Sequence, residues 1–143
     1  MNLEITNTST LAEVQRDFNA LYPYLKLEFF AKAITRNGNV TKKTIKNPRA
    51  TFKEARTNQL DTHITISPNL TVAAFEKRFV DTYGFVAAVL RQSGRGWIET
   101  GTQTAEWTLE KQNAEGKAVS NYPQNGNDST NFSASPGAPP QAR

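Results

Sequence analysis

The sequence contains no cysteine and only one histidine, His63, in 143 residues. Without cysteine the chain can form neither disulfides nor thiolate metal sites, and one histidine does not make a zinc site. The carboxylates are scattered as well, so we expect no bound metal and no cofactor. No stretch approaches the roughly 18 consecutive apolar residues of a transmembrane helix, and no secretory leader pattern begins the sequence. We therefore expect a soluble cytoplasmic protein that makes no membrane contact.

Signatures of catalysis are also missing. His63 and Asp61 fall on one face of an expected strand, but no nucleophile or third group accompanies them, so we expect His63 to be structural or solvent-facing. The loop 93–96 has the glycines of a phosphate-binding loop, yet a strand follows it instead of a helix, and a hairpin turn accounts for it. We predict no catalytic residue, and an enzyme is the least favoured class.

The clearest fold signal lies in the middle of the chain. Thr71 is an expected N-cap, and apolar side chains at spacings of three and four over 72–83 predict an amphipathic helix that ends at Gly84. The apolar run 85–90 predicts a central strand that is covered on both faces. A glycine-containing turn then leads into 97–100, which predicts an antiparallel return strand.

Weaker patterns extend this unit on both sides. Thr10 and Glu13 have the spacing of a capping box before an apolar stripe, which predicts a helix over 11–21. Alternation predicts strands that begin at residue 25 and at residue 62, the second one ending at residue 66. The segment 105–115 predicts a short helix that begins near Thr104 or Thr108 and ends at Gly116.

Positive charge is concentrated in residues 31–60, which hold eight basic side chains and one acidic side chain, although the whole chain has a net charge of only +4. Asn37-Gly38 predicts a hairpin that joins strands over 25–34 and 40–45. Asn47-Pro48 predicts a short helix that begins there and continues through Arg56. The many Lys and Asn residues around the turn are also compatible with a flexible loop.

Together these elements predict an α+β domain over residues 1–116. We expect a small, mostly antiparallel sheet of three to five strands, two main helices packed on one face and a short C-terminal helix. Residues 117–143 are rich in Asn, Ser, Gly, Pro and Gln, which predicts a disordered tail.

The basic insert is the one feature that points to a partner class. A dense positive field favours phosphate backbones, and Arg91, Arg95 and Trp97 extend it if they lie on the same side. The residues predicted to bind nucleic acid are Lys42, Lys43, Lys46, Arg49, Lys53, Arg91 and Arg95. The competing interpretation is a solvated, Lys-rich edge hairpin that keeps the sheet from pairing with other chains. We expect Trp97 and Trp107 to pack in the core.

One local pattern resembles a known group of proteins. Trp97-Ile98-Glu99-Thr100, followed by Glu106-Trp107-Thr108-Leu109 and Gln112, is similar to small uncharacterised bacterial α+β proteins. The resemblance spans about residues 62–113 and implies one domain and a bacterial origin, without an activity.

The sequence therefore favours a small non-catalytic binding module, an accessory protein that acts through an unidentified protein partner. The alternative is a nucleic-acid-binding protein that uses segment 31–60. The oligomeric state stays open.

Overall fold

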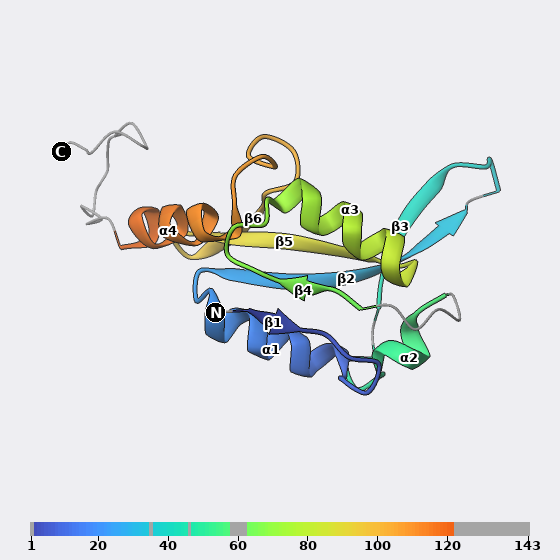
Figure 1. Cartoon of the computed structure of the whole chain (residues 1–143). Coiled ribbons are helices and arrows are strands. Elements are labelled where there is room, and N and C mark those ends of the chain that lie inside the picture. The colour runs from blue at the N-terminus through green and yellow to red at the C-terminus, as the bar shows by residue number, and fades with distance from the viewer. Residues whose placement is uncertain (1, 35, 46, 58–62, 122–143) are drawn as a thin grey trace.

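Four helices and six strands make up the described part of the chain, which comprises residues 2–34, 36–45, 47–57 and 63–121 of a computed structural model (Figure 1). In chain order they are β1 (Leu3–Glu4), α1 (Leu11–Leu21), β2 (Leu25–Ile34), β3 (Val40–Thr44), α2 (Phe52–Ala55), β4 (Thr65–Ile66), α3 (Val72–Tyr83), β5 (Val86–Ser93), β6 (Gly96–Glu99) and α4 (Leu109–Ser120). The four-stranded antiparallel sheet has the order β3-β2-β5-β6, and β1 pairs with β4 in a second, two-stranded sheet. The α+β class predicted from the sequence is confirmed.

Local capping interactions set the ends of the two main helices. The Glu13 N–H donates to Thr10 Oγ1 at 3.1 Å, and the Thr10 N–H donates to Glu13 Oε1 at 2.8 Å, so the capping box of α1 is complete. Thr71 caps α3 by accepting the Ala74 N–H at 3.1 Å. Gly84 ends α3 with a φ of 83°, the left-handed conformation in which glycine costs least. Both helices therefore begin and end where the sequence predicts.

The long strand β2 is shared by two partners along its length. Its first part, from Leu25 to Phe30, pairs with β5, and its last part, from Phe30 to Ile34, pairs with β3. Gly38 has a φ of 82° in the connection between Ile34 and Val40, a left-handed conformation that glycine adopts without strain. The β2–β3 hairpin predicted from Asn37-Gly38 is confirmed, and it projects from one end of the sheet (Figure 1).

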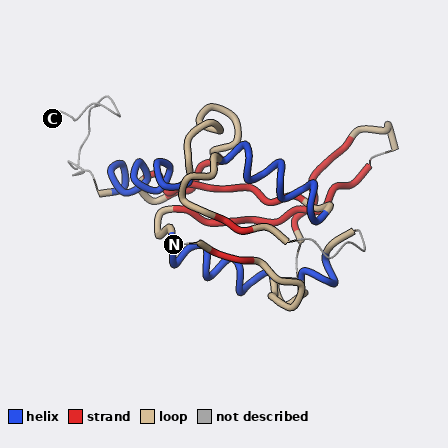
Figure 2. The backbone as a smooth tube through the Cα atoms, in the orientation of Figure 1, coloured by secondary structure: helices blue, strands red, loops and turns tan. Residues whose placement is uncertain are grey.

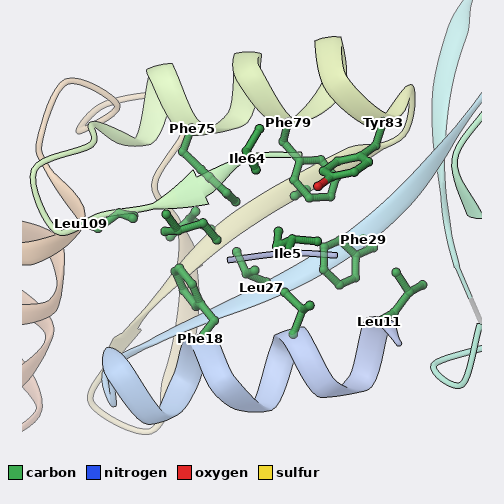
Figure 3. Close-up of a cluster of buried hydrophobic side chains, with 14 of the residues drawn as sticks. Ile5, Leu11, Phe18, Leu27, Phe29, Ile64, Phe75, Phe79, Tyr83 and Leu109 are labelled. Atoms are coloured by element: carbon green, nitrogen blue, oxygen red, sulfur yellow. The ribbon is translucent and has the colours of Figure 1, made fainter. Parts of the chain in front are cut away.

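The core lies on one face of the four-stranded sheet, between that face and the helices α1 and α3 (Figures 1 and 2). Phe29 of β2 stacks on Phe79 of α3 with ring centroids 5.6 Å apart, and Phe18 of α1 lies 6.3 Å from Phe75 of α3. Ile5, Ile64 and Ile66 belong to the same cluster, so the segments of the small sheet pack against the helices from that side (Figure 3). Burial of this aromatic cluster is the dominant stabilising contribution.

Several predicted element boundaries were wrong, including the end of the strand expected over 85–90, which continues to Ser93. The short helix begins at Phe52 with Thr51 as its N-cap, while Asn47 accepts the Arg49 N–H at 3.1 Å in a separate turn. The last helix does not end at Gly116 but continues to Ser120, with Thr108 as its N-cap. The strand expected over 62–66 begins at Thr65 and ends at Ile66, since residues 63 and 64 are not part of it, and residue 62 lies outside the described residues.

The prediction that the tail begins at residue 117 was wrong, because α4 includes residues 117–120; the part of the predicted tail after residue 121 lies outside the described residues. No helix in the described ranges is long and apolar enough to cross a membrane.

Candidate functional site

The edges of the four-stranded sheet differ in whether side chains cover their backbone hydrogen-bonding groups, and this difference defines the candidate site. An unpaired edge presents backbone N–H and C=O groups to any extended chain that approaches it. Along the first part of β2, where β3 no longer pairs, helix α1 covers these groups. Gln15 Nε2 donates to the Leu27 carbonyl at 3.0 Å, and Asn19 Nδ2 donates to the Leu25 carbonyl at 2.8 Å. This edge is closed by side-chain amides.

The edge of β5 beyond the end of β6 is closed as well. The Val89 N–H donates to Glu76 Oε2 of α3 at 3.0 Å. The Val89 carbonyl accepts from the Thr100 N–H at 3.2 Å and from Thr100 Oγ1 at 2.8 Å. The Glu76 carboxylate and the buried Thr100 hydroxyl therefore satisfy the outward backbone groups of Val89.

The outer edge formed by β3 carries lysines. Its register places Lys43 opposite Ala31 and Lys42 opposite Lys32, and the Lys43 side chain is exposed. Charged residues on an edge strand oppose pairing with another chain because that pairing would bury them.

The edge strand β6 carries one charged residue, Glu99, and among the described residues no side chain is hydrogen-bonded to its outward backbone as Gln15, Asn19 and Glu76 are elsewhere. All four of its residues are exposed, and Trp97 and Ile98 are the exposed large hydrophobic residues of the described chain, at 37% and 42%. The prediction that Trp97 packs in the core was wrong, because β6 is an edge strand. The Lys26 ammonium lies 4.8 Å from the centre of the Trp97 ring. Trp107, by contrast, is half-buried, with Arg91 and Lys111 over its ring.

The backbone of β6 also has an open hydrogen-bonding side. In an antiparallel pair, successive residues direct their N–H and C=O groups alternately toward and away from the partner. The Gln92 N–H donates to the Tyr24 carbonyl at 2.9 Å, so Gln92 faces β2, and its β6 partner Trp97 faces away from β5. By the same alternation Glu99, opposite Leu90, also directs its peptide groups outward.

The residues predicted to bind nucleic acid do not form one surface. Lys43, Arg49 and Lys53 are exposed at the end of the molecule where β3 and α2 lie. Only the backbone of Lys42 is described, and Lys46 lies outside the described residues. Arg91 and Arg95 belong to the β5–β6 hairpin at the other end of the sheet. Arg91 pairs with Leu25 and Lys43 with Ala31, six positions apart on β2, which corresponds to roughly 20 Å.

Two of the arginines have structural partners. Arg91 Nη1 donates to Gln112 Oε1 at 2.8 Å, and its guanidinium lies 5.6 Å from the Trp107 ring centre. Arg56, from the basic insert, is only 9% exposed and donates to Asn7 Oδ1 at 2.7 Å. The Arg91 contact joins α4 to the sheet, and the Arg56 contact joins the end of α2 to the loop before α1, so both charges are engaged within the fold.

The residues weighed in the sequence for metal binding or catalysis lie as follows. Within the described ranges no three His, Asp or Glu side chains are grouped to hold a metal ion. His63 is exposed, and Asp61 lies outside the described residues. A hollow of about 250 Å³ lies beside α1 and the β2–β3 junction, and its polar lining includes Gln15, Glu28 and Thr44.

The shifted pKa values belong to packing and capping. Burial raises the pKa of Tyr22, and burial also raises the pKa of Tyr83, although the nearby Ile64 backbone and the Arg56 charge partly offset this. The hydrogen bond from the Thr10 backbone N–H lowers the pKa of Glu13 below its ordinary 4.5. None of these three side chains lines the hollow.

Sequence reasoning missed Ile98 as a surface residue and misplaced Trp97. A usable signal was present, because β6 is the last strand in the order of the chain and is only four residues long, as short edge strands often are. Comparisons with protein families, with curated proteins and with solved structures each find no match. The resemblance to small bacterial proteins therefore stays a prediction, and the open edge of β6 is the candidate site on which a function can be argued.

Proposed function

We propose that this protein is a non-catalytic binding module that takes up an extended segment of a protein partner along β6. The partner strand adds to the four-stranded sheet, so its backbone bonds to the outward groups of Trp97 and Glu99. Alternate side chains of the partner then meet the exposed Trp97 and Ile98 side chains.

The observation that carries the proposal is the contrast between edges. Gln15 and Asn19 close the β2 edge, and Glu76 closes the β5 edge, with direct hydrogen bonds to the backbone. On β6 two large apolar side chains stand where edge strands usually carry charge or proline. Tryptophan is enriched among the residues that dominate binding energy at protein interfaces.

A selection from a displayed library of short random peptides tests this proposal even though the partner is unidentified. We expect extended peptides to be enriched on the full-length protein and to shift the fluorescence of Trp97. Binding should slow amide hydrogen exchange at Trp97 and Glu99, because their N–H groups become hydrogen-bonded.

The decisive variant is Glu99→Pro. Proline removes the outward N–H and places its ring on the open edge, while the bonds between β5 and β6 are kept because Glu99 faces away from β5. Its matched control is Glu99→Thr, which keeps the N–H and has a high strand preference. We expect Glu99→Pro to abolish peptide binding and Glu99→Thr to retain it. Failure to enrich any peptide, or equal binding by both variants, refutes the proposal.

A second function is supported by the charge at the opposite end of the molecule. The Arg36, Lys43, Arg49 and Lys53 side chains are all exposed, and none takes part in the ion pairs found among the described residues. Such a cluster suits a phosphate backbone and is the basis for nucleic-acid binding as the alternative proposal.

Anisotropy of labelled DNA and RNA oligonucleotides across a salt series tests this alternative. Phosphate contacts release counterions, so binding should fall steeply as salt increases. We expect a triple Lys43→Glu, Arg49→Glu, Lys53→Glu variant to lose binding, while Lys117→Glu on the exposed side of α4 keeps it. Absence of binding at low salt excludes the alternative.

A further inference from the structure

We propose that the strand taken up by β6 is β6 of a second copy of this chain, paired antiparallel across a two-fold axis. This inference rests on the proposed function, whose partner it names. In the pairing, Trp97 lies opposite its counterpart, and Arg95 lies opposite Glu99 of the partner copy on both sides of the axis.

The hairpin geometry restricts the pairing to a few registers. Ser93 pairs with Gly96, which leaves a two-residue loop of Gly94 and Arg95. Gly94 has a φ of 63° and Arg95 has no positive φ, the pattern of a type II′ turn that suits tightly connected strands. Because Trp97 and Glu99 face outward, hydrogen-bonded pairs with a partner strand must join odd-numbered positions. A register that places Trp97 opposite Ile98 is therefore excluded.

The charges beside Trp97 favour one of the remaining registers. Arg95, in the turn directly before β6, stands two residues before Trp97, and Glu99 stands two residues after it, so the edge has a basic residue at one end and an acidic residue at the other. With Trp97 on the axis, antiparallel pairing brings each Arg95 to the Glu99 of the other copy. The register that centres Ile98 instead places Glu99 opposite Trp97 and leaves Arg95 without an acidic partner.

A second copy fits this edge better than an unrelated strand. A two-fold interface brings the same patch of both copies together. An edge with Arg95 before Trp97 and Glu99 after it is therefore complementary to itself. Both side chains are exposed, and no ion pair within the described chain engages either of them. At the axis the two indoles form a cross-strand aromatic pair, which adds to the backbone bonds.

The interface is small, so the association should be weak. Four residues of edge strand bury less area than a standard stable interface, and such contacts are typically transient. We expect sedimentation equilibrium of the full-length protein to show a monomer–dimer equilibrium that shifts toward dimer over a concentration series reaching the millimolar range.

Charge reversal with mixing tests the register. Arg95→Glu gives each copy two acidic groups at the interface, and Glu99→Arg gives each copy two basic groups, so each variant alone should dimerise about tenfold more weakly or worse. Mixed in equal amounts, the two variants place opposite charges together on both sides of the axis. We expect the mixture to recover the dimerisation of the wild-type protein. We expect circular dichroism to show that both variants are folded, because both positions are exposed.

The outcomes separate the two proposals. A wild-type protein that stays monomeric, while selected peptides still bind β6, overturns the second-copy inference and leaves the proposed function standing. A dimer that does not respond to charge reversal, or that is not restored by mixing, also overturns it. If neither peptides nor a second copy bind at β6, both proposals fall.

Discussion

Replacement of Gly116 by alanine is the sharpest stability test of how α4 is docked. Gly116 is buried inside the helix, where glycine is normally unfavourable, and alanine is preferred by about 1 kcal/mol at an exposed helical position. A Cβ atom at this position, however, would lie 2.8 Å from Tyr24 Cβ, 3.1 Å from Arg91 Cγ and 3.2 Å from the Tyr24 carbonyl oxygen. Two of these three neighbours belong to Tyr24, directly before β2, and are not the far ends of flexible side chains.

The size of the effect follows from what must move. To accept the methyl group, α4 has to shift away from β2 by a few tenths of an ångström. That shift stretches two hydrogen bonds, from the Tyr24 N–H to Asn113 Oδ1 and from Arg91 Nη1 to Gln112 Oε1, both 2.8 Å long. Overpacking costs about 1–3 kcal/mol, and the gain in helix preference offsets about 1 kcal/mol of it. The net loss in the free energy of unfolding should therefore lie between about 0 and 2 kcal/mol, so that Gly116→Ala does not stabilise the protein.

Urea denaturation followed by circular dichroism measures this loss, and amide exchange in α4 shows whether the helix detaches locally. The matched control is Ala114→Gly, at an exposed position of the same helix, which should destabilise by about 1 kcal/mol through helix preference alone. If alanine at position 116 stabilises the protein, the close approach of α4 to Tyr24 is refuted.

Three further predictions concern the core and the caps. Gly84→Ala should destabilise the protein by about 1–2 kcal/mol, because its φ of 83° strains any side chain and the new methyl group would overlap Thr57 Oγ1; thermal unfolding measures the loss. Phe79→Ala should cost about 3–5 kcal/mol in urea denaturation, since the side chain is fully buried among other rings, and a loss below 1 kcal/mol would contradict that packing. The pKa of Glu13 is lowered by its bond from the Thr10 N–H, so its contribution is fully present above the unfolded pKa near 4.5 and is lost as the pH falls through the folded value. Between roughly pH 6 and pH 3, which bracket that transition, the free energy of unfolding of the wild type should therefore fall more than that of Glu13→Gln. An equal fall in both proteins would refute the role of this carboxylate.

The features that sequence predicted well depend on contacts only a few residues apart. Thr10 with Glu13, Thr71 as a cap, Gly84 as a stop and Asn37-Gly38 as a turn all act within one helical turn or one hairpin. Their interaction partners are therefore written beside them in the chain, and the surrounding fold has little influence on the outcome.

The start of α2 shows where local signals conflict. Both Asn47-Pro48 and Thr51 with Glu54 are valid helix starts in the sequence. The fold selected the second, because the backbone carbonyls of Ser9 and Asn7 accept the N–H groups of Phe52 and Lys53 at 2.9 and 3.0 Å. Those carbonyls come from a segment more than 40 positions away, which no local pattern contains.

The basic insert shows the same limit for function. Its charges are adjacent in sequence, but Arg56 is buried against Asn7 and Tyr83, and Arg91 is held by Gln112. Whether a charge meets solvent or a neighbouring element depends on the packing of distant segments, so a count of charges overstates the surface that is free to bind.

By itself, the sequence determined the α+β class, the two main helices with their caps, the β2–β3 hairpin and the central position of β5. Hydrophobic periodicity and capping are local properties, and they suffice for these features. Only the tertiary structure decided that Gly116 lies against Tyr24, that Gln15, Asn19 and Glu76 close two edges of the sheet, and that Trp97 and Ile98 are left on an open one. Each of these depends on which distant backbone a residue meets, and that is determined when the strands and helices pack together.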